Sequence, residues 1–179
     1  LTGGGGMITT NNEESATHLK FLVNQARDTS KGYYHPEIGY NYRMTNLEAS
    51  MGLAQLERLS EFLENKRKFN KIYREEFENI EKIKMQKEYQ ECESSWWMTS
   101  IIIDSEKEIP EIQEELKKEG IPTRRIFIPI TEFPPYKKYA NSDYKNAYYI
   151  YEKGLNLPGS TLNSEKQIKK IAGSIISVL

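Results

Sequence analysis

Three polar side chains stand just ahead of a helix start signal, and together they could bind an anion. Asn41, Tyr42 and Arg43 supply an amide, a phenol and a guanidinium. Thr45 and Glu48 follow with the S/T-x-x-E spacing of a capping box, in which each side chain satisfies a backbone N–H of the other residue. The N-terminal end of a helix also attracts phosphate, through its free N–H groups and its dipole. On spacing alone, a well-capped core helix behind a Gly turn is the favoured explanation of the segment.

The remaining residues that could take part in catalysis or bind a metal do not form a recognisable pattern. The run from Gly3 to Gly6 precedes an expected strand, and it lacks both the G-x-G-x-x-G spacing and the Walker lysine, so a flexible turn explains it. His18, His35 and the one cysteine, Cys92, are far apart in the chain, and no metal ligand set is expected. No Ser-His-Asp or Cys-His order indicates a hydrolase.

The elements that must position these side chains begin with a short strand at residues 7–10. This strand has no partner nearby in the sequence, so its sheet must be supplied elsewhere. Apolar residues at helical spacing then predict a helix over residues 13–27. From Asn46 to about Ile80 the pattern predicts one long helix, straight or bent, with charges opposite its apolar face. Helices of that length often bridge two structural units.

Beyond the long helix, alternating strand and helix signals predict a small α+β unit. Its expected elements are a strand at residues 96–104, a helix from Pro110 to a stop at Gly120, a strand from Ile121 to Ile130 broken by Pro129, a helix over 142–153, a strand or turn at 154–158 and a final helix after Asn163.

The composition excludes several classes of function. The net charge of −1 gives no basic field for nucleic acid or an anionic membrane surface. No apolar run approaches the ~20 residues that span a bilayer. The single cysteine forms no intramolecular disulfide and fits a reducing cytoplasm, the expected compartment.

The block GYNYRMTNLEASMGLAQLERL, together with the opening LTGGGGMI, resembles the DegT-type sugar aminotransferases. These enzymes use pyridoxal phosphate (PLP) on the fold type I scaffold. The resemblance implies an α/β fold class in which this chain is the C-terminal part. Residues 1–45 would be a remnant of the large PLP-binding domain, residues 46–81 a long linking helix, and residues 82–179 a small α+β domain.

The same resemblance implies where the catalytic lysine lies. In the family, the Schiff-base lysine stands just upstream of a Thr-Gly-Gly turn, and this chain begins inside that turn. The lysine is therefore expected upstream of Leu1. Lys20 and Lys31 do not sit in the motif, and neither is proposed as a replacement. The chain alone is expected to have no transaminase activity and to self-associate through its open apolar surface.

Five residues are assigned to binding by the resemblance. Asn41 would hydrogen-bond the PLP phosphate of the neighbouring subunit. Arg43 would serve the same phosphate or a nucleotide diphosphate, with a structural ion pair as the alternative. His35 would approach the substrate from the partner subunit. Tyr42 is a substrate contact or a packing residue, and Arg124 is a contact to a substrate phosphate or part of a solvated face.

One departure from the family pattern concerns the substrate. Many relatives carry Pro-Leu-His where this chain has Pro129-Ile130-Thr131, so a histidine contact to the sugar nucleotide is not carried over. Arg124 and Arg125 lie nearby and point to opposite faces of a regular strand, so that only one could meet a phosphate.

The expected function is that of a homodimeric PLP-dependent aminotransferase. It would aminate a nucleotide-linked keto sugar for cell-surface or secondary-metabolite glycan biosynthesis, with glutamate as amino donor. Two alternatives remain. One is a non-catalytic binding or dimerisation module without the Schiff-base lysine. The other is an RNA-binding domain that stacks bases on Trp96 and Trp97, which the near-neutral charge disfavours.

Overall fold

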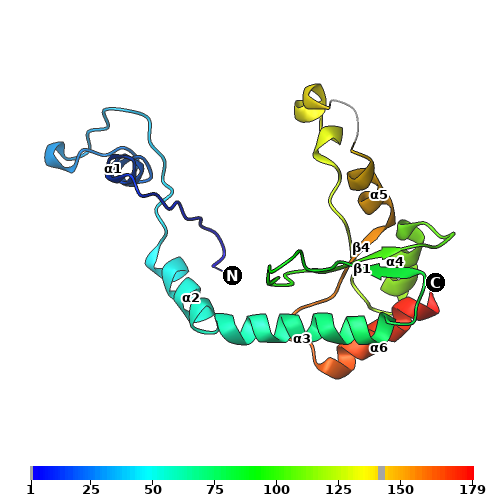
Figure 1. Ribbon diagram of the computed structural model, residues 1–179. Coiled ribbons are helices and arrows are strands. Elements are labelled where there is room, and N and C mark those ends of the chain that lie inside the picture. The colour runs from blue at the N-terminus through cyan, green and yellow to red at the C-terminus, as the bar shows by residue number, and fades with distance from the viewer. Residues whose placement is uncertain (1, 141–143) are drawn as a thin grey trace. The chain divides into compact units, whose positions relative to one another are not determined.

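The computed structural model describes residues 2–140 and 144–179, and the chain divides into two compact units, Leu1–Leu59 and Ser60–Leu179. Figure 1 shows helices throughout and strands in the second unit. Each unit is described by itself.

The first unit contains α1 (Glu13–Leu22), a short 3₁₀ helix (Thr29–Lys31) and α2 (Asn46–Glu57). α1 begins where the Asn12 side chain accepts a hydrogen bond from the Ser15 N–H (2.7 Å). It ends before the predicted residue 27, because Gln25 and Ala26 adopt φ values of 65° and 49°, which a right-handed helix cannot contain.

Two predictions for this part of the chain can be compared with the structure. Residues 7–10 form no strand within the described chain, which offers them no partner; the sequence had indicated that their sheet is supplied elsewhere. The long helix, expected as straight or bent, is interrupted at Arg58 and so divides into α2 and α3 (Leu59–Phe77). At Arg58 the backbone has φ −104° and ψ 9°, and its N–H donates to Gln55 O at i−3 (3.2 Å), which interrupts the α-helical pattern.

The second unit is built on an antiparallel sheet in the order β1-β2-β4-β3. The strands are β1 (Ile83–Met85), β2 (Thr99–Ile103), β3 (Arg124–Arg125) and β4 (Gly154–Leu157). In β2 the alternate residues Thr99, Ile101 and Ile103 are buried, as expected for a strand with one face on the core. Ile101 pairs with Leu155, and Ile103 pairs with Ile83.

Helices α3, α4 (Ile109–Lys118) and α6 (Glu165–Ser177) supply the rest of the core, and α5 (Lys145–Lys153) leads into β4. Tyr73 of α3 is fully buried, and its hydroxyl donates to Pro158 O at 2.8 Å. Burial raises the pKa of that hydroxyl. α3 and α6 lie side by side (Figure 1). An ion pair between Lys68 and Glu165 (2.6 Å) joins the two helices.

Most predicted elements of this unit are confirmed. β2, α4 and α6 form as expected, and Gly120 ends α4 with φ +76°, a conformation that glycine adopts easily. The strand expected from Ile121 to Ile130 shrinks to Arg124–Arg125, because only these two residues pair with β4. β1 was missed, since three residues give too short a pattern. The expected start of a helix at residue 142 lies outside the described residues.

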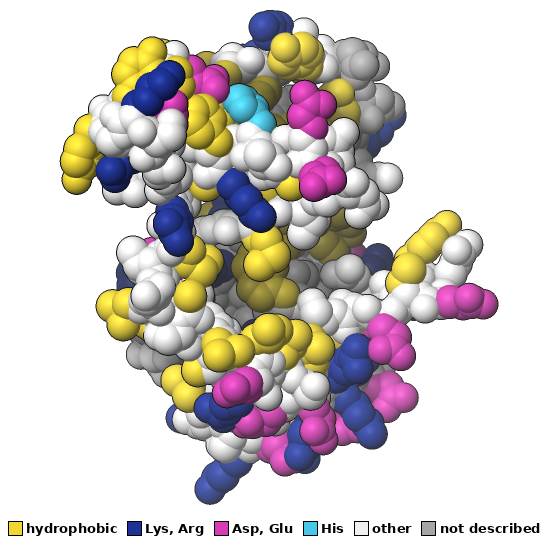
Figure 2. Space-filling view, turned by 90° about the vertical axis from the view of Figure 1, so that its left-hand side faces the viewer, with side chains coloured by type: hydrophobic (Ala, Val, Ile, Leu, Met, Phe, Trp, Pro, Cys, Tyr) yellow, Lys and Arg dark blue, Asp and Glu magenta, His cyan; other side chains and the backbone are white. Residues whose placement is uncertain are grey.

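The two units differ sharply in burial. In the second unit, seventeen side chains form one hydrophobic core, whereas Ala26 is the one buried apolar residue among the described residues of the first. Figure 2 shows hydrophobic side chains gathered in surface patches on one face. Among the exposed apolar residues of α2 are Leu47, Leu53 and Leu56. None of the helices in the described part of the chain is both long and apolar enough to span a membrane.

Candidate functional site

The segment that carries Asn41 is tied to the end of α1 by backbone hydrogen bonds. Tyr40 N–H donates to Leu22 O (2.8 Å), and Tyr42 N–H donates to Val23 O (3.0 Å). Asn24 and Asn41 form an antiparallel bridge between the two segments. Residues 40–42 therefore have a defined position although all of their side chains are exposed.

Gly39 allows this segment to approach the chain that follows α1. A Cβ at position 39 would lie 2.2 Å from the backbone N of Ala26 and 2.8 Å from the Ala26 Cβ. No rotamer change relieves such a contact, because the nearest atom belongs to the backbone. Ala26 is fully buried against the segment. Any larger side chain at residue 39 would displace the residues that lead to Asn41.

The predicted capping box is present at the start of α2. Thr45 Oγ1 accepts from Glu48 N–H (3.2 Å), and Glu48 Oε2 accepts from Thr45 N–H (2.8 Å). The hydrogen bond from the Thr45 backbone, followed by the one from its hydroxyl, lowers the pKa of Glu48 below its ordinary value of 4.5. A carboxylate therefore stands at the helix end where free N–H groups were expected to attract an anion.

A cavity of about 1120 Å³ lies beside this helix start, within the first unit. It is lined by residues 5–10, by one face of α1 and by residues 41–45 with Glu48. The sequence-predicted Asn41, Tyr42 and Arg43 thus meet at one cavity.

The charges at this cavity leave donors free for an anion. Among the described residues, the side chains of Asn41 and Arg43 make no hydrogen bond or ion pair with another group. Lys20 of α1 lines the same cavity, opposed by the carboxylate of Glu48. An amide, a guanidinium and an ammonium together form a donor set that suits a phosphate.

The other two assigned residues lie elsewhere. Nδ1 of His35 is 2.8 Å from Gln25 O, and His35 does not line the cavity. Arg124 is in the second unit and lines a different pocket. The neighbouring Arg125 packs its guanidinium over the Tyr151 ring at 4.2 Å and donates to Tyr151 O, so the two arginines have different surroundings. Tyr42 stacks on Tyr40 with ring centroids 5.0 Å apart.

Lys20 is the residue that the sequence reasoning missed at this cavity. Lys20 lies outside the Schiff-base motif, and no local sequence pattern marks it as a phosphate contact. Ala16, Leu19, Lys20 and Val23 share one face of α1 by their i, i+3, i+4 and i+7 spacing, and all four line the cavity. Within the described residues, no group of three or more His, Cys, Asp or Glu side chains is placed to hold a metal ion.

Comparison with known proteins identifies relatives over almost the whole chain. Residues 1–176 match the model of the DegT/DnrJ/EryC1/StrS aminotransferase family. GDP-perosamine synthase of Escherichia coli O157:H7 is 34% identical over 175 residues, which are 97% of this chain and 47% of that protein. The chain thus spans about half the length of the curated relatives it matches.

Solved structures share the fold. The aminotransferase TlmJ from Streptoalloteichus hindustanus superposes with a TM-score of 0.88 at 20% identity, covering 99% of this chain and 48% of TlmJ. The PLP form of Spr1654 from Streptococcus pneumoniae gives a TM-score of 0.78 at 24% identity, covering 97% of this chain and 46% of Spr1654. The fold is that of the C-terminal half of fold type I sugar aminotransferases, as the resemblance predicted.

We expect Gly39→Ala to detach the Asn41 segment from α1. The added Cβ meets backbone at 2.2 Å, and backbone strain on the order of 1–3 kcal/mol should lower the protection of the Tyr40 and Tyr42 amides about 10- to 100-fold in hydrogen exchange. Gly173→Ala is the control, since a Cβ in that helix meets nothing within 4 Å. Unchanged protection in Gly39→Ala would contradict this account.

We also expect the start of α2 to weaken at low pH. The folded pKa of Glu48 is lowered, so the cap is fully present above the ordinary value of 4.5 and is lost as the pH falls through the lowered pKa. NMR titration of the Thr45 and Glu48 amides measures this transition. Glu48→Gln should abolish it, and a midpoint at or above 4.5 in the unmodified chain would show the cap to be absent.

Proposed function

The chain belongs to the DegT/DnrJ/EryC1/StrS aminotransferase family, whose members depend on PLP, and we propose that it forms part of an enzyme that aminates a nucleotide-linked keto sugar. The observation that carries this proposal is the unpaired donor set of Asn41 and Arg43 at the large cavity of the first unit. Its composition suits the phosphate of PLP.

Asn41 and Arg43 would hold that phosphate in different ways. The Asn41 amide donates without adding charge, whereas the Arg43 guanidinium can donate two parallel hydrogen bonds and neutralise one negative charge. Bound PLP supplies the electron sink for transamination. This chain's own part is to orient the cofactor through its phosphate, with the position of Asn41 set by the backbone bonds to Leu22 and Val23.

Glu48 limits how an anion can bind at this cavity. Its carboxylate already accepts from Thr45 N–H, and it repels a phosphate placed directly on the helix axis. The phosphate is therefore best held from the side, by Asn41, Arg43 and Lys20, which all line the cavity.

The exposed apolar surface of the first unit supports a second copy as partner. Leu47, Leu53 and Leu56 of α2 are 72%, 58% and 64% exposed. Side chains of this kind gather at subunit interfaces. A homodimer would cover them, and it would allow Asn41 and His35 to serve the active site of the neighbouring subunit, as the resemblance implies.

The relatives indicate which substrate to test first. Because GDP-perosamine synthase is 34% identical over this chain, a GDP-linked keto sugar is the first candidate, with glutamate as amino donor. Arg124 is exposed, lines a pocket of the second unit that also holds Lys66 and Lys170, and is assigned to a substrate phosphate. His35 and Tyr42 remain proposed substrate contacts.

The alternative is a non-catalytic binding or dimerisation module. The exposed leucines of α2 favour an assembly role whether or not a lysine is supplied. The intact mass of the natural polypeptide distinguishes the two: about twice 20.9 kDa with a lysine upstream of Leu1 supports the enzyme, and 20.9 kDa supports the module.

A transamination assay tests the proposed activity directly. The natural polypeptide, loaded with PLP, is mixed with glutamate and a series of nucleotide-linked keto sugars. Formation of 2-oxoglutarate and an amino sugar nucleotide, seen by mass spectrometry, is the expected result. Product with no member of the series, from protein that retains PLP, would overturn the proposed substrate class.

We expect Asn41→Asp to weaken PLP retention in the natural polypeptide by about 10- to 100-fold, because it removes a donor and adds a charge that repels phosphate. The dissociation constant is measured by cofactor absorbance. Asn12→Asp is the matched control, since aspartate caps α1 as well as asparagine does. Equal retention in the two variants would remove Asn41 from the phosphate site.

A further inference from the structure

The second unit contains a half-buried lysine that has no carboxylate partner. Lys66 of α3 donates to the backbone oxygen of Trp97 at 3.0 Å, and no ion pair forms at its ammonium within the described residues. Burial lowers the pKa of Lys66, which shows that the charged form is poorly solvated. A desolvated cation without a counterion is stabilised by any anion that reaches it.

Lys66 faces a pocket whose charged lining is mainly basic. The pocket has a volume of about 570 Å³. Its titratable side chains are the cations Lys66, Arg124 and Lys170 and the one carboxylate of Glu119. α6 begins at this pocket, where Asn163 lines the wall, so the positive end of that helix adds to the field. The lining therefore favours an anion.

An exposed indole lies at the same pocket. Trp97 is 66% exposed and lines the wall next to Lys66, whereas the adjacent Trp96 is only 7% exposed. Trp96 packs beneath Arg74, whose guanidinium lies 5.1 Å from its ring centroid. Trp97 is thus the tryptophan of this pair with a free face, and a planar base can stack on it.

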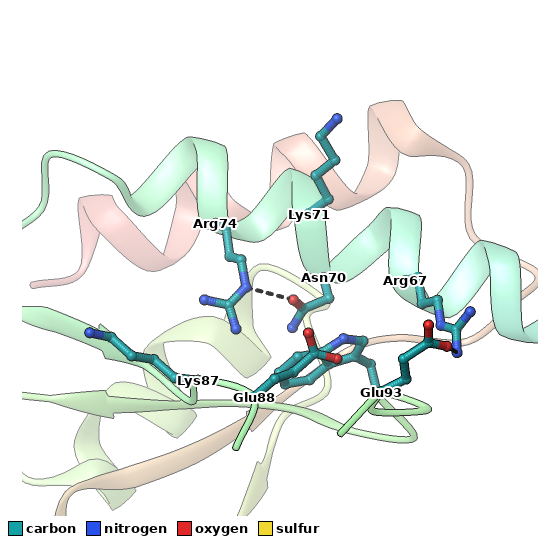
Figure 3. Close-up of a pocket in the computed structure, with 8 residues that line it drawn as sticks. Arg67, Asn70, Lys71, Arg74, Lys87, Glu88 and Glu93 are labelled. Carbon is teal, nitrogen blue, oxygen red and sulfur yellow. Dashed lines mark hydrogen bonds and ion pairs between the residues drawn. The ribbon is translucent and has the colours of Figure 1, made fainter. Parts of the chain in front are cut away.

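A second pocket on α3 provides a contrast, because its arginines already have partners. In Figure 3, Arg74 bonds the buried Asn70 (2.8 Å) and Arg67 lies against Glu93 (2.9 Å). Lys71 points away from the others in the same view. Arg67 is thus neutralised by a carboxylate, whereas Lys66 meets only a carbonyl oxygen.

We propose that the pocket of Lys66, Arg124, Lys170 and Trp97 binds a nucleoside diphosphate, with the diphosphate at the cations and the base on Trp97. The proposal extends the assignment of Arg124 to a substrate phosphate. Only the choice of a nucleotide as the ligand rests on the proposed function. It adds Lys66, Lys170 and Trp97 as binding residues. Binding requires neither PLP nor the first unit's donors.

The test measures binding of pyrophosphate, GDP and UDP to the full chain by calorimetry without PLP. Both nucleotides should bind more tightly than pyrophosphate. Lys66→Met should weaken all three ligands by about 10- to 100-fold. Lys71→Met is the matched control on the same helix, where the side chain is 77% exposed, and it should leave the three affinities unchanged.

Two further variants keep the outcomes distinct. Trp97→Ala should lower the affinity for GDP and UDP to that for pyrophosphate. Trp97→Phe keeps an aromatic ring, so the nucleotides should still bind more tightly than pyrophosphate. The same series is repeated in an Asn41→Ala background, which should weaken anion binding at the first cavity. The losses caused by Lys66→Met and Trp97→Ala should persist there, so a failure of the proposed PLP site does not affect this result. Equal loss in Lys66→Met and Lys71→Met, or no binding of any probe, would overturn the proposal.

Discussion

No side chain fits between residue 39 and the backbone of Ala26, and the placement of Asn41 and Arg43, the proposed anion-binding residues, depends on that approach. Because the two chain segments are in contact, the backbone N–H groups of Tyr40 and Tyr42 can donate to the carbonyl groups that α1 leaves free at its end. The helix end and the Asn41 segment therefore satisfy each other's backbone groups. The side chains of Asn41 and Arg43 remain available because the backbone alone holds the segment in position.

The two proposed anion-binding surfaces differ in their physical situation. At the first cavity, donors are exposed and a capping carboxylate restricts where a phosphate can lie. At the second pocket, a cation is partly removed from water with no counterion beside it. An anion at the first site would be selected by the arrangement of the donors, whereas one at the second site would be attracted by uncompensated charge.

Local patterns in the sequence were sufficient for the capping box of Thr45 and Glu48 and for α4 with its stop at Gly120. In each case the stabilising contact spans only a few residues. The roles of Gly39 and Lys66 could not be predicted, because each depends on a contact distant in sequence; Lys66 and Trp97 are 31 residues apart. The strand expected at residues 7–10 does not form within the described chain for the same reason, since strand propensity has no effect without a partner.

The unequal burial of the two units has a consequence for how the chain folds. The second unit encloses its own core, so it can fold without help from elsewhere. In α2 the leucines at 47, 53 and 56 point to different sides of the helix, and all of them are exposed. A helix of this kind gains its stability from surfaces that the described chain does not itself supply. The folding of α2 therefore depends on whatever surface covers these leucines, whereas the second unit encloses its core with its own residues.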